Sequence, residues 1–482
     1  MTIPADLRVP FLYVEFDSTR AFTGPSVLRY KVLMVGQRLA GGTRAELITD
    51  RVTSAAQAAG FYGEGSQLAL MFAKWFQGNK QTEVYGCALD DDAAGVQATG
   101  TFAITGPASA AGSVVFYIGG VRIPIAVADT DTATDIGDAL VAAITTALPV
   151  TAVNVTGTVT LTARNDGEPG NDIDLRVNYN PGEEMPTGVA VVVTPMASGA
   201  NNPDLADVIA AIGDEWYNLI IAPFNDATNL TTIETELTSR FGPLRQIDGM
   251  YLTTKTGTVG QLATFGNSRN NPHVSCPHSQ KVPCMGFQFA AAYGAQVAAE
   301  GAADPARPLQ TLELVGILPP VVEDRFTLSE NNSLLYDGIS TFYVDTGGKV
   351  RIQRAITMYQ TNVVGAPDIA YLDVETLLTL MFLRYDFRTQ ILTRYPRAKL
   401  ADDGVQVGPG QVVMTPKLGK SEAVNIFRGW ETLGLVENVE QFKSEMSCVR
   451  SITDPNRLDW ILPPDLINQF RVGSAVIQFL LD

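Results

Sequence analysis

Two parts of the chain show short runs of apolar residues that alternate with longer stretches in which apolar residues recur at helical spacing. The predicted strands in this pattern are Val32–Val35, Thr82–Leu89, Asn218–Ala222 and Ile247–Thr253. Three helices are predicted. The first is capped by Ser54 and runs through Phe76, with a glycine interruption at 60–65. The other two cover 227–241 and about 257–269. Strands that alternate with helices favour an α/β fold, with parallel strands and helices on both faces of the sheet.

The stretch from about 93 to 200 has a different pattern, because it is poor in Lys and rich in Thr, Val, Ala and Gly. Its apolar residues form short alternating strands, and one predicted helix, about Ala133–Ala147, interrupts them. The predicted strands include Ser113–Ile118, Val159–Thr162 and Val189–Val193. This pattern indicates a β-rich domain inserted into the α/β domain, at a surface loop where the two chain ends lie close together.

After residue 308 the pattern becomes that of a mixed α+β region. Residues Val350–Tyr359 alternate between polar and apolar side chains at a period of two, which predicts a strand. A long helix is expected from Asp373 to about Tyr395, where a proline stops it, and an amphipathic helix is expected at Ser421–Leu433.

Both ends of the chain have the character of apolar strands. Residues Leu7–Asp17 are extended in character and apolar on both faces, so another part of the protein has to cover them. An edge strand of the chain's own domain is the alternative for this segment. The last predicted strand, Phe470–Leu481, is also too apolar for a free tail. The apolar residues in question are Phe11, Leu12, Tyr13, Val14 and Phe16 in the first segment and Val472, Val476, Ile477 and Phe479 in the last.

Composition narrows the classes of function. The 482 residues are 46% apolar, enough for several cores, and the net charge of −17 argues against a surface that binds nucleic acid or anionic lipid. Four cysteines and two histidines exclude a disulfide scaffold and leave little material for metal or histidine chemistry. No targeting segment or membrane span is expected, and a reducing cytoplasm is the expected folding compartment.

The strongest candidate for metal chemistry is the segment that contains both histidines and two of the four cysteines. These residues are His273, Cys276, His278 and Cys284. Zinc sites usually pair their ligands two to four residues apart, and this spacing matches no common zinc pattern. We therefore expect no metal site and interpret the segment as a strand with incidental thiols.

Other catalytic patterns are incomplete. Gly419-Lys420-Ser421 resembles the end of a phosphate-binding loop, but Met414 stands where that loop needs its first glycine. We expect Lys420 in a turn and Ser421 as the cap of the next helix. No nucleophile elbow is present, and acidic pairs such as Asp402-Asp403 are explained by solvated loops. The prediction is therefore a protein without catalytic residues and without a cofactor.

One cluster of positive charge stands out in this acidic chain. It comprises Arg384, Arg388, Arg394, Arg397 and Lys399. The simpler interpretation is a solvated helix end that complements the helix dipole. The alternative is a docking face for an acidic protein surface, on which charge complementarity discriminates between partners.

Several stretches resemble tail sheath proteins of Mu-like contractile bacteriophages. They are Arg8–Asp17 with the following Arg20-Ala21, Tyr30–Gln37, Asn267–His273 and Leu458–Pro464. The resemblance covers nearly the whole length, including the insertion. It implies a structural subunit that forms stacked hexameric rings around a tail tube and contracts to drive the tube through a host envelope during genome ejection. It also implies a subtilisin-like α/β architecture without protease activity.

The resemblance further implies that terminal arms donate strands to sheets of neighbouring subunits. The expected divisions are an N-terminal arm at 1–20, the α/β sheath domain at 21–92 and 201–304, an outer inserted domain at 93–200, a tube-proximal α+β domain at 305–469 and a C-terminal arm at 470–482. Arg384, Arg388, Arg394 and Arg397 are then expected to face the tube. We also expect that deletion of the insertion leaves assembly intact.

The implied partners are other copies of the chain, the tail tube protein, and baseplate and tail terminator proteins, with no nucleic acid and no membrane insertion. The implied location is the virion tail, after assembly in the host bacterial cytoplasm. Two alternatives stay open at this point. One is the sheath of a tailocin or other phage-derived injection particle, and the other is a zinc-dependent or hydrolase-type enzyme.

Overall fold

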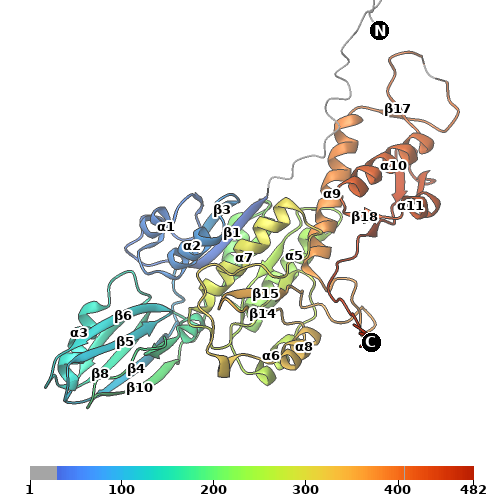
Figure 1. Ribbon diagram of the computed structural model, residues 1–482. Helices are drawn as coiled ribbons and strands as arrows, with labels where there is room; N and C mark the ends of the chain where they lie inside the picture. The colour runs from blue at the N-terminus through green and yellow to red at the C-terminus, as the bar shows by residue number, and fades with distance from the viewer. Residues whose placement is uncertain (1–29, 407, 482) are drawn as a thin grey trace, which may run out of the picture. The chain divides into compact units, whose positions relative to one another are not determined.

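The computed structural model describes residues 30–406 and 408–481 (Figure 1). The described residues form two compact units, which we call the large unit (30–381 with 469–481) and the small unit (382–468). The expected boundary at residue 305 therefore differs from the one observed between 381 and 382. The reason is that Leu309, Leu314 and Ile352 are buried in the same hydrophobic core as the α/β elements.

A six-stranded sheet organises the large unit. Its strand order is β13-β12-β11-β1-β3-β2, and all neighbours are parallel except the antiparallel pair β2 and β3. The strands are β1 (Lys31–Gln37), β2 (Thr49–Val52), β3 (Glu83–Leu89), β11 (Leu219–Ile221), β12 (Met250–Leu252) and β13 (Val274–Ser275). The parallel α/β arrangement expected from the alternating pattern is thus confirmed.

Helices cover both faces of this sheet, as expected. Val32 and Met34 of β1 belong to the core that includes α2 and α7, whereas Leu33 and Val35 belong to the core that includes α4 and α5. The helices are α1 (Ala55–Tyr62), α2 (Gln67–Gly78), α4 (Leu205–Ile212), α5 (Ala227–Phe241), α6 (Val259–Asn267) and α7 (Gly286–Ala303). Ser54 caps α1 by accepting a hydrogen bond from the Gln57 amide, as its position before the helix predicts.

The insertion folds as two antiparallel sheets with the helix α3 (Ala133–Ala143). One sheet has the order β10-β4-β8-β7 and the other β6-β5-β9. Their strands are β4 (Gln97–Thr105), β5 (Gly112–Ile118), β6 (Val121–Val127), β7 (Val150–Val155), β8 (Thr158–Asp166), β9 (Leu175–Val177) and β10 (Ala190–Ala197), with the short helix η1 (Glu168–Asp172). Burial along β8 alternates at a period of two, and this alternation places Asn165 on the same buried face as Val159, Leu161 and Ala163.

The remaining large-unit elements are η2 (Val322–Asp324), α8 (Leu328–Tyr336) and the hairpin of β14 (Thr341–Val344) and β15 (Val350–Arg354). The strand expected through Tyr359 ends at Arg354. Beyond it, Ile356 bridges to Asp373 and the Met358 amide donates to the carbonyl of Val274, so the chain leaves its hairpin partner for β13.

The small unit is built around two helices. The long helix α9 (Val374–Arg394) contains the boundary between the units, and its bounds agree with the expected helix. The other elements are α10 (Pro416–Thr432), α11 (Val439–Glu445), β16 (Lys399–Leu400), β17 (Val413–Met414), β18 (Val436–Glu437), β19 (Ser447–Arg450), β20 (Leu458–Ile461) and β21 (Asp465–Leu466). These short strands form three two-stranded sheets, β16-β17, β18-β21 and β19-β20.

The start of α10 corrects one expectation. Lys420 and Ser421 lie inside the helix, which begins with Pro416 at its first position and Thr415 as its cap. The Thr415 hydroxyl accepts a hydrogen bond from the Leu418 amide at 3.2 Å. Proline at the first helical position loses no intrahelical hydrogen bond, and the helix has its cap at Thr415, six residues before the expected Ser421 cap. Among the helices of residues 30–406 and 408–481, none is both long enough and apolar enough to cross a membrane.

Candidate functional site

Parallel α/β sheets usually bind ligands at the carboxyl ends of their strands, where the strand order reverses. In this protein part of the insertion occupies that edge. The Gln37 side chain, at the end of β1, donates to Asp91 Oδ1 at 2.6 Å and to the Asp166 carbonyl at 2.7 Å. Asn165 donates to the same Asp91 oxygen at 3.0 Å and accepts from the Gln67 amide at 3.0 Å. The end of β8 therefore fills the place where an enzyme of this architecture would hold its substrate.

A small polar cavity of about 170 Å³ persists beside the carboxyl ends of β11 and β12. Its walls include Asn225 and Lys255, whose side chains are hydrogen-bonded at 2.7 Å, and the insertion's Asp172. Burial raises the pKa of Asp172 to about 6, and the neighbouring Lys255 opposes that shift. The cavity is an internal junction between the insertion and the sheet.

The histidine and cysteine segment lies in the hydrophobic core. His273 packs against Phe241, and His278 packs between Phe326 and Phe342 with ring centroids 4.9 and 4.6 Å away. Burial lowers the pKa of His278 to about 3 and raises the pKa of the buried thiols Cys276 and Cys284 to about 12. In the part of the chain that the structure describes, no three His, Cys, Asp or Glu side chains gather as a metal-binding group.

The C-terminal segment exposes a run of apolar side chains. Residues 467–481 form no strand, in contrast to the strand expected over Phe470–Leu481. A strand needs a partner, and within the described chain this segment has none. Its most exposed large apolar side chains are Phe470, Val472, Val476, Ile477, Phe479, Leu480 and Leu481, each between 76% and 93% exposed. Contiguous apolar exposure of this kind marks an interaction surface.

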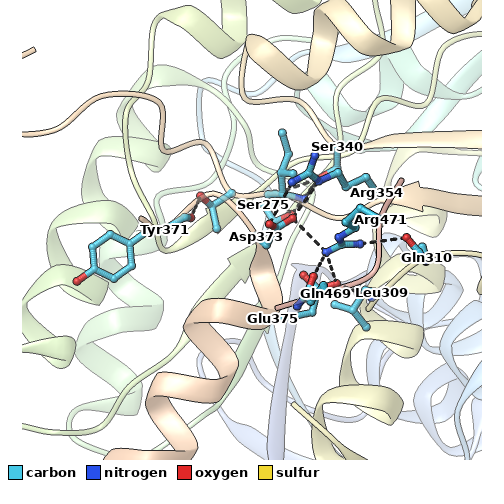
Figure 2. Close-up of polar contacts among 12 residues, drawn as sticks. Ser275, Leu309, Gln310, Ser340, Arg354, Tyr371, Asp373, Glu375, Gln469 and Arg471 are labelled. Carbon is cyan, nitrogen blue, oxygen red and sulfur yellow. Dashed lines mark hydrogen bonds and ion pairs between the residues drawn. The ribbon is translucent and has the colours of Figure 1, made fainter. Parts of the chain in front are cut away.

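The start of this segment is held by charge (Figure 2). The Arg471 guanidinium lies 3.1 Å from Asp373 and 2.9 Å from Glu375, at the beginning of α9. Glu375 is fully buried and also accepts a hydrogen bond from the Leu309 amide. None of these three residues was expected from the sequence to be functional. The available signal was that Arg471 is the one cation in an apolar run from 470 to 481.

The basic residues of α9 and its C-terminal flank do not form one uniform surface. Arg388 and Arg397 are exposed, as is Lys399. Arg394 instead forms an ion pair with Glu422 of α10 at 2.6 Å and also donates to Gln390. Arg384 is half-buried and has an interaction within the chain. Of the four expected tube-facing arginines, two are therefore exposed on the part of the chain that the structure describes.

The N-terminal candidates Phe11, Leu12, Tyr13, Val14 and Phe16 lie outside the described residues.

Family models match most of the second half of the chain. The phage tail sheath protein central domain matches residues 198–358, and the phage tail sheath C-terminal domain matches residues 366–479. The Mu-like prophage FluMu tail sheath protein of Haemophilus influenzae is 42% identical over 481 residues, covering 99% of each chain.

Solved structures of sheath proteins are also similar to this chain. The sheath tail protein from Desulfitobacterium hafniense is 12% identical, covering 95% of this chain and 100% of that chain, with a TM-score of 0.48. The contracted PVC sheath complex of an extracellular contractile injection system is 10% identical, covering 99% and 98%, with a TM-score of 0.49. Both TM-scores are below 0.5, so the assignment rests on the sequence matches. On those matches, the chain belongs to the phage tail sheath protein family.

Proposed function

We propose that this contractile tail sheath subunit polymerises by donating its terminal segments to sheets of neighbouring copies. The polymer would consist of hexameric rings stacked around the tail tube, and its contraction would drive the tube through a host envelope during genome ejection. The observation that carries the proposal is the apolar segment 472–481, in which every residue is exposed and none is part of a strand. Full burial of one large apolar side chain stabilises by roughly 1.5–3 kcal/mol, so this segment gains much from a partner.

The small unit offers acceptors for such a strand. Its three sheets have only two strands each, and isolated two-stranded sheets are marginally stable with unpaired edges. The pair β19-β20 also exposes Val449 and Ile461, at 53% and 66%. A donated strand would pair one edge and cover these side chains, at about 0.5–1.5 kcal/mol net for each hydrogen bond.

Removal of residues 472–482 tests this donation and leaves Arg471 in place. We expect the truncated protein to remain folded and monomeric at concentrations at which the full chain forms tubes, as seen by sedimentation and negative-stain microscopy. A Ser474→Ala variant, which keeps every apolar side chain, is the matched control and should polymerise normally. Tubes of normal yield from the truncated chain would refute the proposal. Removal of residues 1–18 gives the same test for the N-terminal arm.

We propose further that the exposed cations Arg388 and Arg397 contact an acidic surface of the tube. Arg388→Glu with Arg397→Glu should abolish co-sedimentation of the sheath with tubes while sheath polymers still form. Arg394 is left unchanged because its substitution would break the ion pair with Glu422. Lys417→Glu with Lys420→Glu, on exposed positions of α10, changes the net charge equally and is the control. Equal loss of tube binding in both variants would contradict a specific contact.

A structural role without catalysis is also part of the proposal. The insertion fills the carboxyl edge of the sheet through Asn165 and Asp166. The buried His278, with a pKa lowered to about 3, would be a poor general base. These observations favour a protein that works by assembly.

A further inference from the structure

The C-terminal segment returns to the large unit just before it becomes free. The chain passes from the small unit to the large unit between 468 and 469. The next two residues are held weakly, because Gln469 donates to the Ala306 carbonyl at 3.4 Å and the Phe470 carbonyl accepts from Gln310 at 3.3 Å. Arg471 follows, and its side chain is only 13% exposed.

Arg471 is held by a network of buried charge at the start of α9 (Figure 2). Its Nη2 contacts both Asp373 and Glu375, at 3.1 and 2.9 Å. Arg354 of β15 holds the same Asp373 with two hydrogen bonds of 3.0 and 3.1 Å, which fixes that carboxylate from the other side. A buried carboxylate such as Glu375 is costly without a cation, so the network strongly favours the state with Arg471 in place.

The C-terminal segment becomes exposed to solvent immediately after Arg471. Every residue from 472 to 481 is exposed, whereas Arg471 is mostly buried. Without the Arg471 contacts, the last regular element before the segment would be β21, which ends at Leu466. Because the Ile467 amide donates to the Leu435 carbonyl at 3.1 Å, the free segment would then begin four residues earlier, at 468, and would reach roughly 13 Å further at about 3.3 Å per residue.

We propose that Arg471 is a positioning residue that fixes the point at which the C-terminal segment leaves the subunit, by anchoring it to the beginning of α9 in the large unit. A fixed origin limits the volume that the segment explores and so raises its effective concentration at one acceptor on a neighbouring copy. A force applied to the segment would also be transmitted to the large unit and not to the small unit. The consequence for assembly rests on the proposed donation of the segment, but the anchor itself does not.

Spin labels on the full chain can measure the anchor directly. All four native cysteines are buried, so labels attach selectively to Ser474→Cys in the segment and Ala302→Cys at an exposed position of α7. Double electron–electron resonance, at concentrations where sedimentation shows monomers, should give a narrow distance distribution. Arg471→Met should broaden it at least twofold. Arg471→Lys should keep it narrow, because one ammonium can replace the single Nη2 that contacts both carboxylates.

Two controls separate the anchor from general destabilisation. Arg307→Met removes an exposed arginine of the same unit and should leave the distribution unchanged. If circular dichroism shows that Arg471→Met does not fold, Arg471→Ala with Glu375→Gln replaces it, because this pair leaves no unpaired buried carboxylate. A folded anchor variant with a distribution as narrow as that of the parent overturns the proposal.

The assembly consequence has its own readout. Arg471→Met, which removes the anchor, should raise the concentration needed for tube formation about tenfold. Arg471→Lys should form tubes at nearly the same concentration as the parent. The truncation after Arg471 tests donation of the segment, whereas the label distances in monomers test the anchor. Donation of the segment can therefore be refuted while the anchor is supported, and the anchor can be refuted while donation is supported.

Discussion

Two ionisable side chains of the large unit, the buried His278 and the half-buried Asp172, link its stability to pH in opposite directions. The pKa of His278 is lowered to about 3, so the unfolded chain binds a proton more readily once the pH falls below about 6.5. Stability is then lost as the pH falls from 6.5 towards 3. The pKa of Asp172 is raised to about 6, so the folded chain keeps its proton longer. The stability that Asp172 contributes is fully present below about pH 3.9 and is lost as the pH rises to about 6.

Replacement of His278 by Phe should reduce the loss of stability between pH 6.5 and 4. One unit of pKa shift corresponds to about 1.4 kcal/mol, so His278 costs the native protein roughly 3 kcal/mol between pH 6.5 and 4. Urea unfolding at the two pH values should show a smaller difference for His278→Phe than for the parent. Phe326→Leu, which alters the same cluster without a titratable group, should lower stability equally at both. An unchanged acid dependence in His278→Phe would contradict the assignment.

Replacement of Asp172 by Asn should stabilise the protein at pH 7.5 by about 2 kcal/mol, because the amide avoids the burial of a charged carboxylate. The gain should vanish at pH 4, where the aspartate is protonated as well. Asp129→Asn, at an exposed position of the insertion, should change the free energy of unfolding by less than about 0.5 kcal/mol at both pH values. A gain that is the same at both pH values would point to an effect other than titration.

At the scale of secondary-structure elements, local chemistry sets the ends of helices and long-range pairing sets the ends of strands. Helix α5 occupies the expected 227–241, and Asp226 caps it by accepting from the Asn229 amide at 3.0 Å. Strand β15 stops at Arg354 because the chain then pairs elsewhere. The C-terminal segment is the extreme case, since its strand character has no partner within the described chain.

The cap of α10 is open to a direct test. Thr415→Ala should speed hydrogen exchange in the first turn of α10 and destabilise the small unit by about 1 kcal/mol. Ser421→Ala, inside the same helix, is the matched control and should have little effect. If Ser421→Ala were the more destabilising of the two, the observed start of α10 would be wrong.

At the scale of the whole chain, the insertion and the α/β domain share one hydrophobic core. Phe102 and Phe116 of the insertion belong to the same buried cluster as Met285 and Phe287 of the α/β domain. The network at the carboxyl edge adds polar contacts of Asn165 and Asp166. Deletion of the insertion was expected to leave assembly possible, and this continuity argues for a different outcome. An outer position of the insertion in the sheath remains a proposal.

Deletion of residues 93–200 with a short linker should therefore give insoluble protein, because it exposes Met285 and Phe287 and removes the contacts that Asp166 and Asn165 make with Gln37 and Asp91. Asn165→Ala is a milder version that should remain soluble and lose about 2 kcal/mol of stability. Asn154→Ala, whose side chain bonds only within the insertion, provides the comparison. A deleted chain that is soluble and polymerises would show that the shared core is dispensable.

The sequence by itself determined the features that depend on neighbouring residues. The period of apolar positions predicted the parallel sheet, the helices on both its faces, the β-rich insertion and the long helix α9, because periodicity follows directly from helix and strand geometry. It also identified the apolar C-terminal segment.

The tertiary structure decided the features that depend on residues far apart in the chain. It placed Arg471 beside Asp373 and Glu375, about a hundred residues away in sequence, and it paired Arg394 with Glu422. It also placed the boundary between the two compact units at 381/382, whereas the sequence predicted a domain that starts at 305. An ion pair or a shared core leaves no periodic trace in either of the segments that form it, so only the folded chain shows which charges are satisfied and which stay available for a partner.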